Sequence, residues 1–238
     1  MPMWLFKSDI AFGKTGLLEG FRECHCHLLP GVDDGVKKLE DTLDILAQWE
    51  SAGVNEVWFT PHVMEDMPNT PADLQKRFAE VQEAYQGIIR LHLSAENMLD
   101  NLFPQRLEKK ELLPLWGNHL LVETSYFNPP LHMEETMEAI KQAGYRPVLA
   151  HPERYRYMEM ADYRKWKADD VLFQLNFPSL VGAYGPEVQH KAHTLLEKGM
   201  YDLTGSDTHS PGFVKYYMEG KLPRKMVKLL EPLFVVSI

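Results

Sequence analysis

The chain has only two cysteines, Cys24 and Cys26, which stand one residue apart. Two thiols are too few for a disulfide framework, and this pair is badly placed for a bridge, which predicts a reducing, cytoplasmic setting. No apolar run approaches the roughly 18 residues of a membrane span, and residues 1–20 hold no apolar stretch of signal-peptide length. The chain also lacks an excess of positive charge: 34 acidic residues outnumber 25 basic ones, and the formal net charge is -9. We therefore expect no firm membrane insertion and no nucleic-acid partner.

Repeats, low-complexity segments and a glycine-rich dinucleotide fingerprint are absent from the sequence as well. The 238 residues are 45% hydrophobic, which is enough for a substantial core in one large domain or two small ones. We predict a single domain over residues 21–238, preceded by an N-terminal extension over residues 1–20. The extension contains Trp4, Leu5 and Phe6. Packing of this arm on its own domain is favoured over contact with a partner or a membrane.

Seven predicted strands alternate with helical segments along the chain. Apolar periodicity and glycine or proline boundaries place the strands at 21–26, 56–60, 89–95, 119–122, 147–150, 171–175 and 201–204. The helices are expected at 39–51, 71–87, 102–110, 133–143, 163–168, 186–198 and 224–230. Such alternation predicts parallel strands joined by crossovers. We predict an α/β fold, a seven-stranded parallel (β/α)7 barrel of the TIM-like kind.

Residues 23–35 read ECHCHLLPGVDDG and carry the most informative motif. His25 and His27 are two residues apart, so on a strand both imidazoles point to one face, about 7 Å apart at the backbone. A Pro-Gly turn then leads to the carboxylates Asp33 and Asp34. This combination suits a mixed nitrogen and oxygen metal site. An isolated pair of histidines at this spacing is equally often an ordinary polar strand end.

Ligand-type residues recur where the other predicted strands end. Together with Asp34 from the turn, the candidates are His25, His27, His62, Glu96, Glu123, His151, Asp207 and His209. In a parallel barrel these strand ends share one rim, which is where barrel active sites lie. Because six of the seven strands contribute, we predict that these side chains meet in space.

Nine candidate ligands are too many for one catalytic zinc ion, which takes about three protein ligands. They suit two or three divalent ions that share bridging carboxylates. The mixture of imidazole and carboxylate fits manganese, iron or zinc. Sites with several metal ions are well suited to hydrolysing phosphate esters, because they supply a hydroxide and neutralise phosphoryl charge.

The motifs resemble those of the polymerase and histidinol phosphatase (PHP) superfamily. Within it, the chain is most similar to the bacterial metal-dependent tyrosine-protein phosphatases of capsule and exopolysaccharide loci. The matching segments, in the family's order, are ECHCHLLPGVDDG, FTPHV, SAEN, LLVETS, LAHPERY and TGSDTHS, which cover about residues 21–210. The resemblance implies a distorted seven-stranded barrel and a three-metal cluster, with manganese favoured.

The resemblance also implies how the ligands are shared among the ions. The first ion would take His25, His27, Glu96 and Asp207; the second Glu96, Glu123 and His151; the third Asp34, His62 and His209. Arg154 in LAHPERY matches the family's phosphate-binding arginine. The alternative for Arg154 is a surface salt bridge with Glu153 or Glu159.

The function implied is hydrolysis of phosphate monoesters, most of all protein phosphotyrosine, in the regulation of capsular or exopolysaccharide synthesis. A metal-activated hydroxide near Glu96 would attack phosphorus while Arg154 holds the phosphoryl oxygens, and Asp34 or His209 would protonate the leaving oxygen. The implied partner is the tyrosine-rich tail of a capsule-locus kinase. Two alternatives are a small-molecule phosphatase, such as one for histidinol phosphate, and a non-catalytic metal-binding module.

The sequence departs from the family pattern at two places. Glu23 stands where the family usually has aspartate, and we expect it to support the ligands without binding metal. The stretch after TGSDTHS lacks the further arginine of some members, and Lys215 is only a weak substitute.

Several other residues are predicted to be structural. Cys24 and Cys26 alternate with the two histidines, so both should face the opposite side of the strand and pack in the core. A cysteine phosphatase needs an arginine six residues after its thiolate, where this chain has Pro30 and Val32. Asn176 either supports the cluster or forms a turn. Surface or packed imidazoles are expected at His92, His119, His132, His190 and His193.

Overall fold

The computed structural model describes residues 9–234, and strands occupy all seven predicted positions. The main strands are β2 (Arg22–Cys26), β3 (Glu56–Phe59), β5 (Arg90–Leu93), β7 (His119–Glu123), β8 (Arg146–Ala150), β9 (Leu172–Asn176) and β10 (Leu203–Gly205). Two short strands, β4 (His62–Val63) and β6 (Glu96–Met98), follow β3 and β5 after a two-residue break. β1 (Ile10–Ala11) and β11 (Lys221–Leu222) form a separate antiparallel pair.

Helices follow most of the strands, as predicted. They are α1 (Leu39–Ser51), α2 (Pro71–Ala84), α3 (Phe103–Glu108), α4 (Met133–Gln142), α5 (Met160–Ala168), α6 (Pro186–Glu197), α7 (Pro211–Glu219) and α8 (Arg224–Phe234), with 3-10 turns η1 (Phe12–Lys14), η2 (Pro152–Arg154) and η3 (Phe177–Val181). α7 was not predicted, although Ser210 caps it by accepting the N–H of Phe213 and Pro211 stands in its first turn. α5 begins three residues earlier than expected, at a capping box between Glu159 and Asp162.

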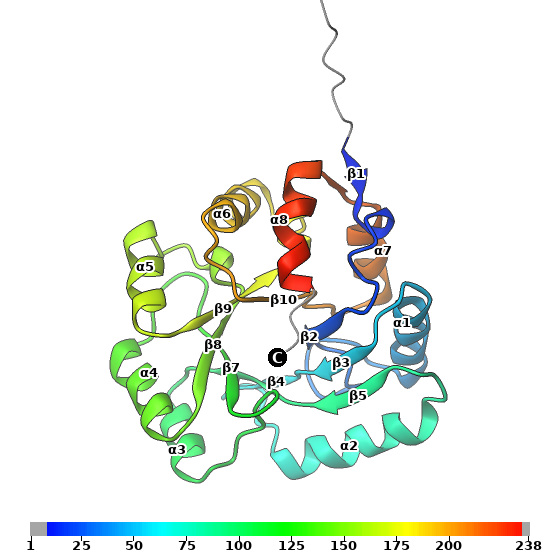
Figure 1. Cartoon of the computed structure of the whole chain (residues 1–238). Helices are drawn as coiled ribbons and strands as arrows, with labels where there is room; N and C mark the ends of the chain where they lie inside the picture. Colours follow the sequence, from blue (N-terminus) through cyan, green and yellow to red (C-terminus); the bar gives the residue numbers. More distant parts are fainter. Residues whose placement is uncertain (1–8, 235–238) are drawn as a thin grey trace, which may run out of the picture.

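The strands curl around a common centre with helices on the outside (Figure 1). Hydrogen bonds divide them into a six-stranded sheet, in the order β10-β9-β8-β7-β6-β4, and a three-stranded sheet, β2-β3-β5. Every pair within the two sheets is parallel. A single bridge between Cys26 and Thr208 links β2 to the segment after β10. The prediction of a parallel α/β fold is confirmed, whereas one continuous seven-stranded barrel is not, because β3 and β5 each break before β4 and β6.

Apolar side chains pack on both sides of the curled sheet. The outward residues of the strands, such as Val57, Val122 and Phe173, join a large cluster with the surrounding helices. The inward residues form a smaller cluster of Leu121, Val148, Leu172 and Leu203 with Cys24. Because Leu121 precedes Glu123 by two residues on β7, the small cluster lies on the same face of the sheet as the candidate ligand Glu123.

Both cysteines are buried, as predicted, but the prediction that both face away from the histidines is wrong for Cys24. Cys26 packs in the outer cluster, whereas Cys24 packs in the inner one. The physical reason is a register shift between Glu23 and Cys26 where β2 pairs with β3. This irregularity interrupts the alternation of side chains, so Cys24 turns inward like His25.

The described part of the N-terminal extension packs on the domain. Phe12 is buried and its ring stacks on Phe177 with 4.6 Å between centroids. Trp4, Leu5 and Phe6 lie outside the described residues. Within residues 9–234 no helix combines the length and the apolar character needed to cross a bilayer.

Candidate metal centre

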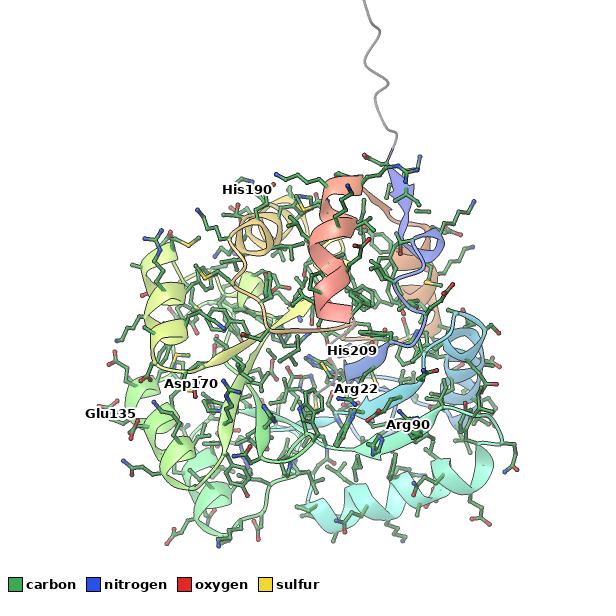
Figure 2. All side chains as sticks on the ribbon, viewed as in Figure 1. Arg22, Arg90, Glu135, Asp170, His190 and His209 are labelled. Carbon is green, nitrogen blue, oxygen red and sulfur yellow. The ribbon has the colours of Figure 1, made fainter. Side chains whose placement is uncertain are left out.

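The candidate ligands lie in or near strands: His25 is within β2, His62 and Glu96 begin β4 and β6, and Glu123 ends β7. The backbone turns sharply at two others. His151 comes directly after β8 and has φ of 32°, and Asp207 comes after β10 with φ of 53°. Residues other than glycine seldom adopt this left-handed conformation, which concentrates at functional sites. In Figure 2, His209 lies toward the middle of the ring of strands, whereas Glu135 and Asp170 lie at the periphery.

His25 and His27 point their Nε2 atoms at each other, 3.2 Å apart. The Nδ1 atom of His25 donates to Oε1 of Gln174 at 2.8 Å, and that of His27 donates to Oδ2 of Asp33 at 2.8 Å. These two hydrogen bonds fix the tautomers and leave both Nε2 lone pairs facing one point. Two such lone pairs cannot hydrogen-bond to each other, so the arrangement suits a cation between them.

Glu96 lies at the centre of the cluster and is fully buried. Its Oε2 atom is 3.2 Å from Nε2 of His25 and 3.3 Å from Nε2 of His27, while its Oε1 atom is 3.0 Å from Nε2 of His151. Burial alone would raise the pKa of Glu96, but His25 and His62 outweigh it and hold the pKa well below the ordinary value. The carboxylate is therefore ionised and shared between two groups of imidazoles, as a bridging ligand requires.

The surroundings of His62 give the clearest test of whether a cation fits. Its Nδ1 atom lies 2.9 Å from Oε1 of Glu123 and 3.1 Å from Oε2 of Glu96. All three atoms are buried, yet within the described part of the chain none has a partner in hydrogen-bond geometry. Burial lowers the pKa of His62, but Glu96 and Glu123 raise it to about 10. The site thus favours a positive charge at this point, which a divalent ion would supply.

Asp34 and His209 form the outer edge of the cluster. Oδ1 of Asp34 lies 3.5 Å from Nε2 of His62 and 3.4 Å from Nε2 of His209. The Asp34 side chain is 57% exposed and that of His209 is 31% exposed, whereas His25 and Glu96 are fully buried. Asp34 and His209 therefore mark the side of the cluster that is open to solvent.

The nine predicted residues come together in overlapping groups whose ligand atoms lie close to one another. These groups are His25, His27 and Asp207; His25, Glu96 and His151; His62, Glu96 and Glu123; and His27, Asp34, His62 and His209. Bonds of about 2.1 Å would place neighbouring ligand atoms roughly 3.0–3.4 Å apart around one ion. The Nε2 and carboxylate distances above are close to this range, so the donor set fits divalent ions.

Arg154 lies beside the cluster and pairs with a carboxylate other than the two considered from the sequence. Its Nη1 atom donates to Oδ2 of Asp207 at 2.7 Å. Its guanidinium also lies over the rings of Tyr126, at 4.3 Å, and Tyr184, at 4.2 Å. Among the described residues its ion pair is with Asp207, and neither Glu153 nor Glu159 forms one with it.

Some residues that hydrogen-bond to the candidate ligands were not predicted from the sequence. Gln174 accepts a hydrogen bond from His25. The sequence could have indicated this role, because Gln174 lies two residues before Asn176 and therefore on the same face of β9. Asp33, one of the two carboxylates of the motif, accepts from Nδ1 of His27. The same carboxylate also accepts the backbone N–H of His62 at 3.0 Å. Tyr184 donates to Oδ2 of Asp207 at 3.1 Å. No sequence pattern marked this tyrosine.

Two residues considered from the sequence support the cluster. Glu23 is buried and its Oε1 atom accepts the backbone N–H groups of His25 at 2.9 Å and Ser206 at 3.0 Å, which ties β2 to the end of β10. Nδ2 of Asn176 donates to Oδ2 of Asp207 at 2.7 Å. Asn176 therefore contacts a candidate ligand directly.

The approach of β10 to β2 requires a glycine. A Cβ atom on Gly205 would lie 2.7 Å from Cβ of His25 and 2.8 Å from Oε1 of Glu23. Such distances are shorter than ordinary van der Waals contact, so any side chain at position 205 would displace His25.

The remaining histidines lie apart from the cluster. His92 stacks on Trp58 with 4.5 Å between centroids, and His193 donates to the carbonyl of Leu180 at 3.0 Å. Within residues 9–234, none of the candidate metal groups includes His92, His119, His132, His190 or His193.

Comparison with known proteins places the chain in a family. The sequence model described as "Capsular polysaccharide synthesis, CpsB/CapC" matches residues 21–220. The chain is 26% identical over 195 residues to the tyrosine-protein phosphatase YwqE of Bacillus subtilis (strain 168), covering 79% of this chain and 77% of the relative. It is 26% identical over 211 residues to the tyrosine-protein phosphatase CpsB of Streptococcus pneumoniae, covering 83% and 86%.

Solved structures support the fold. The structure reported for YwqE and CpsB as "unique metal-dependent tyrosine phosphatases" matches with a TM-score of 0.76 at 22% identity, over 90% of this chain and 88% of that one. The phosphotriesterase homology protein of Escherichia coli matches with a TM-score of 0.51 at 12% identity, over 92% and 93%. Since the family model spans most of the sequence, this chain belongs to the CpsB/CapC family of capsular polysaccharide synthesis proteins.

Proposed function

We propose that this protein is a metal-dependent phosphatase that hydrolyses phosphotyrosine in proteins. The observation that carries the proposal is the joint placement of a buried imidazole and carboxylate cluster and an arginine on one face, linked through Asp207. The relatives named tyrosine-protein phosphatases support the choice of substrate.

The cluster would hold two or three divalent ions, with manganese favoured. We assign His25, His27, Glu96 and Asp207 to the first ion, Glu96, Glu123 and His151 to the second, and Asp34, His62 and His209 to the third. When bound, such ions lower the pKa of water and neutralise charge on phosphoryl oxygens. Gln174 and Asp33 would keep His25 and His27 in the tautomers that present Nε2 to an ion.

Arg154 would bind the phosphoryl group of the substrate. A guanidinium stays protonated and offers a planar fork that matches two phosphoryl oxygens. Its position is fixed before substrate arrives, because Asp207 accepts one N–H group and the two tyrosine rings lie over the guanidinium. Preorganised charge of this kind stabilises the transition state more than it stabilises the substrate.

Asp34 or His209, the exposed members of the cluster, would donate the proton to the leaving oxygen from an atom that does not itself bind the third ion. A tyrosine leaving group has a pKa of about 10, so it needs less help than an alkyl alkoxide. The proposed protein partner is the tyrosine-rich tail of a capsule-locus kinase, acting in the cytoplasm during regulation of capsule or exopolysaccharide synthesis.

We also infer that the two sheets act as one distorted barrel with seven strand positions, closed through the bridge between Cys26 and Thr208. Residues 21–238 would form this one domain, with residues 1–20 as an extension.

The test compares phosphotyrosine with histidinol phosphate on the same purified, manganese-loaded protein. We expect kcat/KM for phosphotyrosine to exceed that for the alkyl phosphate by a wide margin, and EDTA to abolish both. A preference for histidinol phosphate would make the protein a small-molecule phosphatase. Absence of turnover on both, with metal bound, would favour a non-catalytic metal-binding module.

A further inference from the structure

A groove with a volume of about 1120 Å³ opens beside Arg154. Its walls come from η2, the first turn of α5 and the first turns of α6. His190 on α6, at the outer surface in Figure 2, also lines it. The groove therefore includes both Arg154, which contacts the candidate ligand Asp207, and the outer surface of α6.

The groove and the proposed active site share two residues. Arg154 and Tyr184 line the groove, and both donate to Oδ2 of Asp207, at 2.7 Å and 3.1 Å. A phosphate held by Arg154 would thus lie at the inner end of the groove. The substrate polypeptide next to a phosphorylated residue would then enter the groove directly.

The size and lining of the groove suit a polypeptide. Pockets of about 300–1,000 Å³ hold whole drug-sized ligands, so this groove exceeds the needs of one phosphotyrosyl side chain. Met160 and Val188 are half-buried and give it apolar walls. Arg156 is exposed and its guanidinium lies over the ring of Phe127 at 5.0 Å. No carboxylate of the described residues lies within 4.0 Å of it, which leaves its N–H groups available to an acidic side chain.

A second groove, of about 940 Å³, lies between α4 and α5 but has a different character. It includes neither Arg154 nor Tyr184, the two residues that connect the first groove to Asp207. Its charged lining is mostly acidic: Glu134, Glu135, Glu138, Asp162 and Asp169, with Lys165. Such a lining repels a phosphorylated peptide. In the groove at Arg154 the acidic residues Glu153, Glu159 and Glu187 are balanced by Arg154, Arg156 and Lys191, so that groove is the better candidate.

We propose that the groove between α5 and α6 binds the polypeptide that flanks the phosphotyrosine of a protein substrate. An apolar side chain of the substrate would lie on Met160 and Val188, and an acidic one would pair with Arg156. This inference rests on the proposed function, because it assumes that the phosphorylated residue is part of a protein.

Val188→Arg tests the proposal, since a long charged side chain would fill the groove without touching the metal cluster. The substrates are free phosphotyrosine and a peptide with leucine and glutamate on both sides of a phosphotyrosine. We expect kcat/KM for the peptide to fall at least about tenfold, in the range for loss of an interface anchor. For free phosphotyrosine, kcat/KM should stay within about twofold of the parent value.

Ile88→Arg is the matched control, because Ile88 is 83% exposed and lies outside the groove. It should change neither substrate's kcat/KM, and Val188→Ala should keep most of the peptide activity. Melting temperatures check that every variant folds. If Val188→Arg affects both substrates equally, or affects neither, the groove does not bind the flanking polypeptide.

A binding measurement separates this proposal from the proposed function. The probe is the same peptide with a non-hydrolysable difluorophosphonate in place of the phosphate, followed by fluorescence anisotropy. Weaker binding to Val188→Arg than to Ile88→Arg supports the groove even if the parent hydrolyses nothing. Equal binding to both variants overturns the groove assignment, whatever the phosphatase activity.

Discussion

Asp207 joins the arginine to the candidate metal cluster through its two carboxylate oxygens. Oδ2 accepts from Nη1 of Arg154 at 2.7 Å, and Oδ1 lies 3.2 Å from Nε2 of His27. Burial alone would raise the pKa of Asp207, but His25, His209 and Arg154 hold it well below the ordinary value. One ionised carboxylate therefore sets the position of Arg154, the proposed phosphate-binding group, relative to the candidate metal cluster.

The first prediction concerns Arg154. Arg154→Ala should lower kcat/KM for phosphotyrosine. The fall should correspond to a loss of about 2–4 kcal/mol of transition-state stabilisation, the range for removal of one preorganised donor. Arg154→Lys should recover only part of the activity, because an ammonium group lacks the fork. Metal analysis of both variants should show the parent's metal content. Near-parental kcat/KM for Arg154→Ala would mean that Arg154 does not hold the phosphate.

The second prediction concerns Gln174, which accepts from Nδ1 of His25 at 2.8 Å. Gln174→Leu keeps the approximate size but leaves that buried N–H group without its partner, so metal affinity should fall roughly 10- to 100-fold. Competition with a chelator, read by metal analysis, measures the change. Gln142→Leu, at an exposed site on α4, is the control and should bind metal like the parent. Equal affinities in the two variants would remove Gln174 from the supporting residues.

The third prediction concerns Gly205 and compares it with Gly212. A methyl group at 205 would meet His25 and Glu23, so Gly205→Ala should lower the free energy of unfolding by about 1–3 kcal/mol. At 212 the nearest atom is Oγ of Ser210 at 4.0 Å, and Gly212→Ala in α7 should be neutral or stabilising by up to about 1 kcal/mol. Denaturant titration measures both. Similar values for the two variants would contradict the close packing of β10 on β2.

The fourth prediction concerns removal of metal. Dialysis against EDTA should lower the melting temperature, because ions that bind only the folded state stabilise it, by about 2.7 kcal/mol at a hundredfold excess over Kd. Manganese should restore both stability and phosphotyrosine hydrolysis. Cys26→Ser should keep most of the activity, since Cys26 packs in the outer cluster and belongs to none of the candidate metal groups of the described residues. Full activity in EDTA would rule out the metal mechanism.

Local patterns in the sequence were sufficient to locate the seven main strands, most of the helices and the candidate ligands. α1 spans residues 39–51 as predicted, because its apolar spacing and the glycine at position 53 define both ends locally. The ligand-type residues lie at or just after the ends of the predicted strands, a position that can be read from periodicity alone. Their convergence followed from one topological rule, that parallel strands present their carboxyl ends at one edge.

Other features depended on contacts between distant segments. The inward turn of Cys24 comes from a register shift between β2 and β3, and the division into two sheets comes from breaks after β3 and β5. The pairing of Arg154 with Asp207 joins residues 53 positions apart, so nearby Glu153 and Glu159 were the partners that the sequence suggested.

The sequence by itself determined which chemistry is available: imidazoles and carboxylates at strand ends, an arginine close to one of them, and no cysteine loop. Residue type and local periodicity carry that information along the chain. The tertiary structure decided which side chains orient the ligands, which oxygen of Asp207 faces Arg154, and where a groove leads out of the site. These depend on the packing of β9, η3 and α6 against the cluster, and packing between distant segments leaves no local pattern in the sequence.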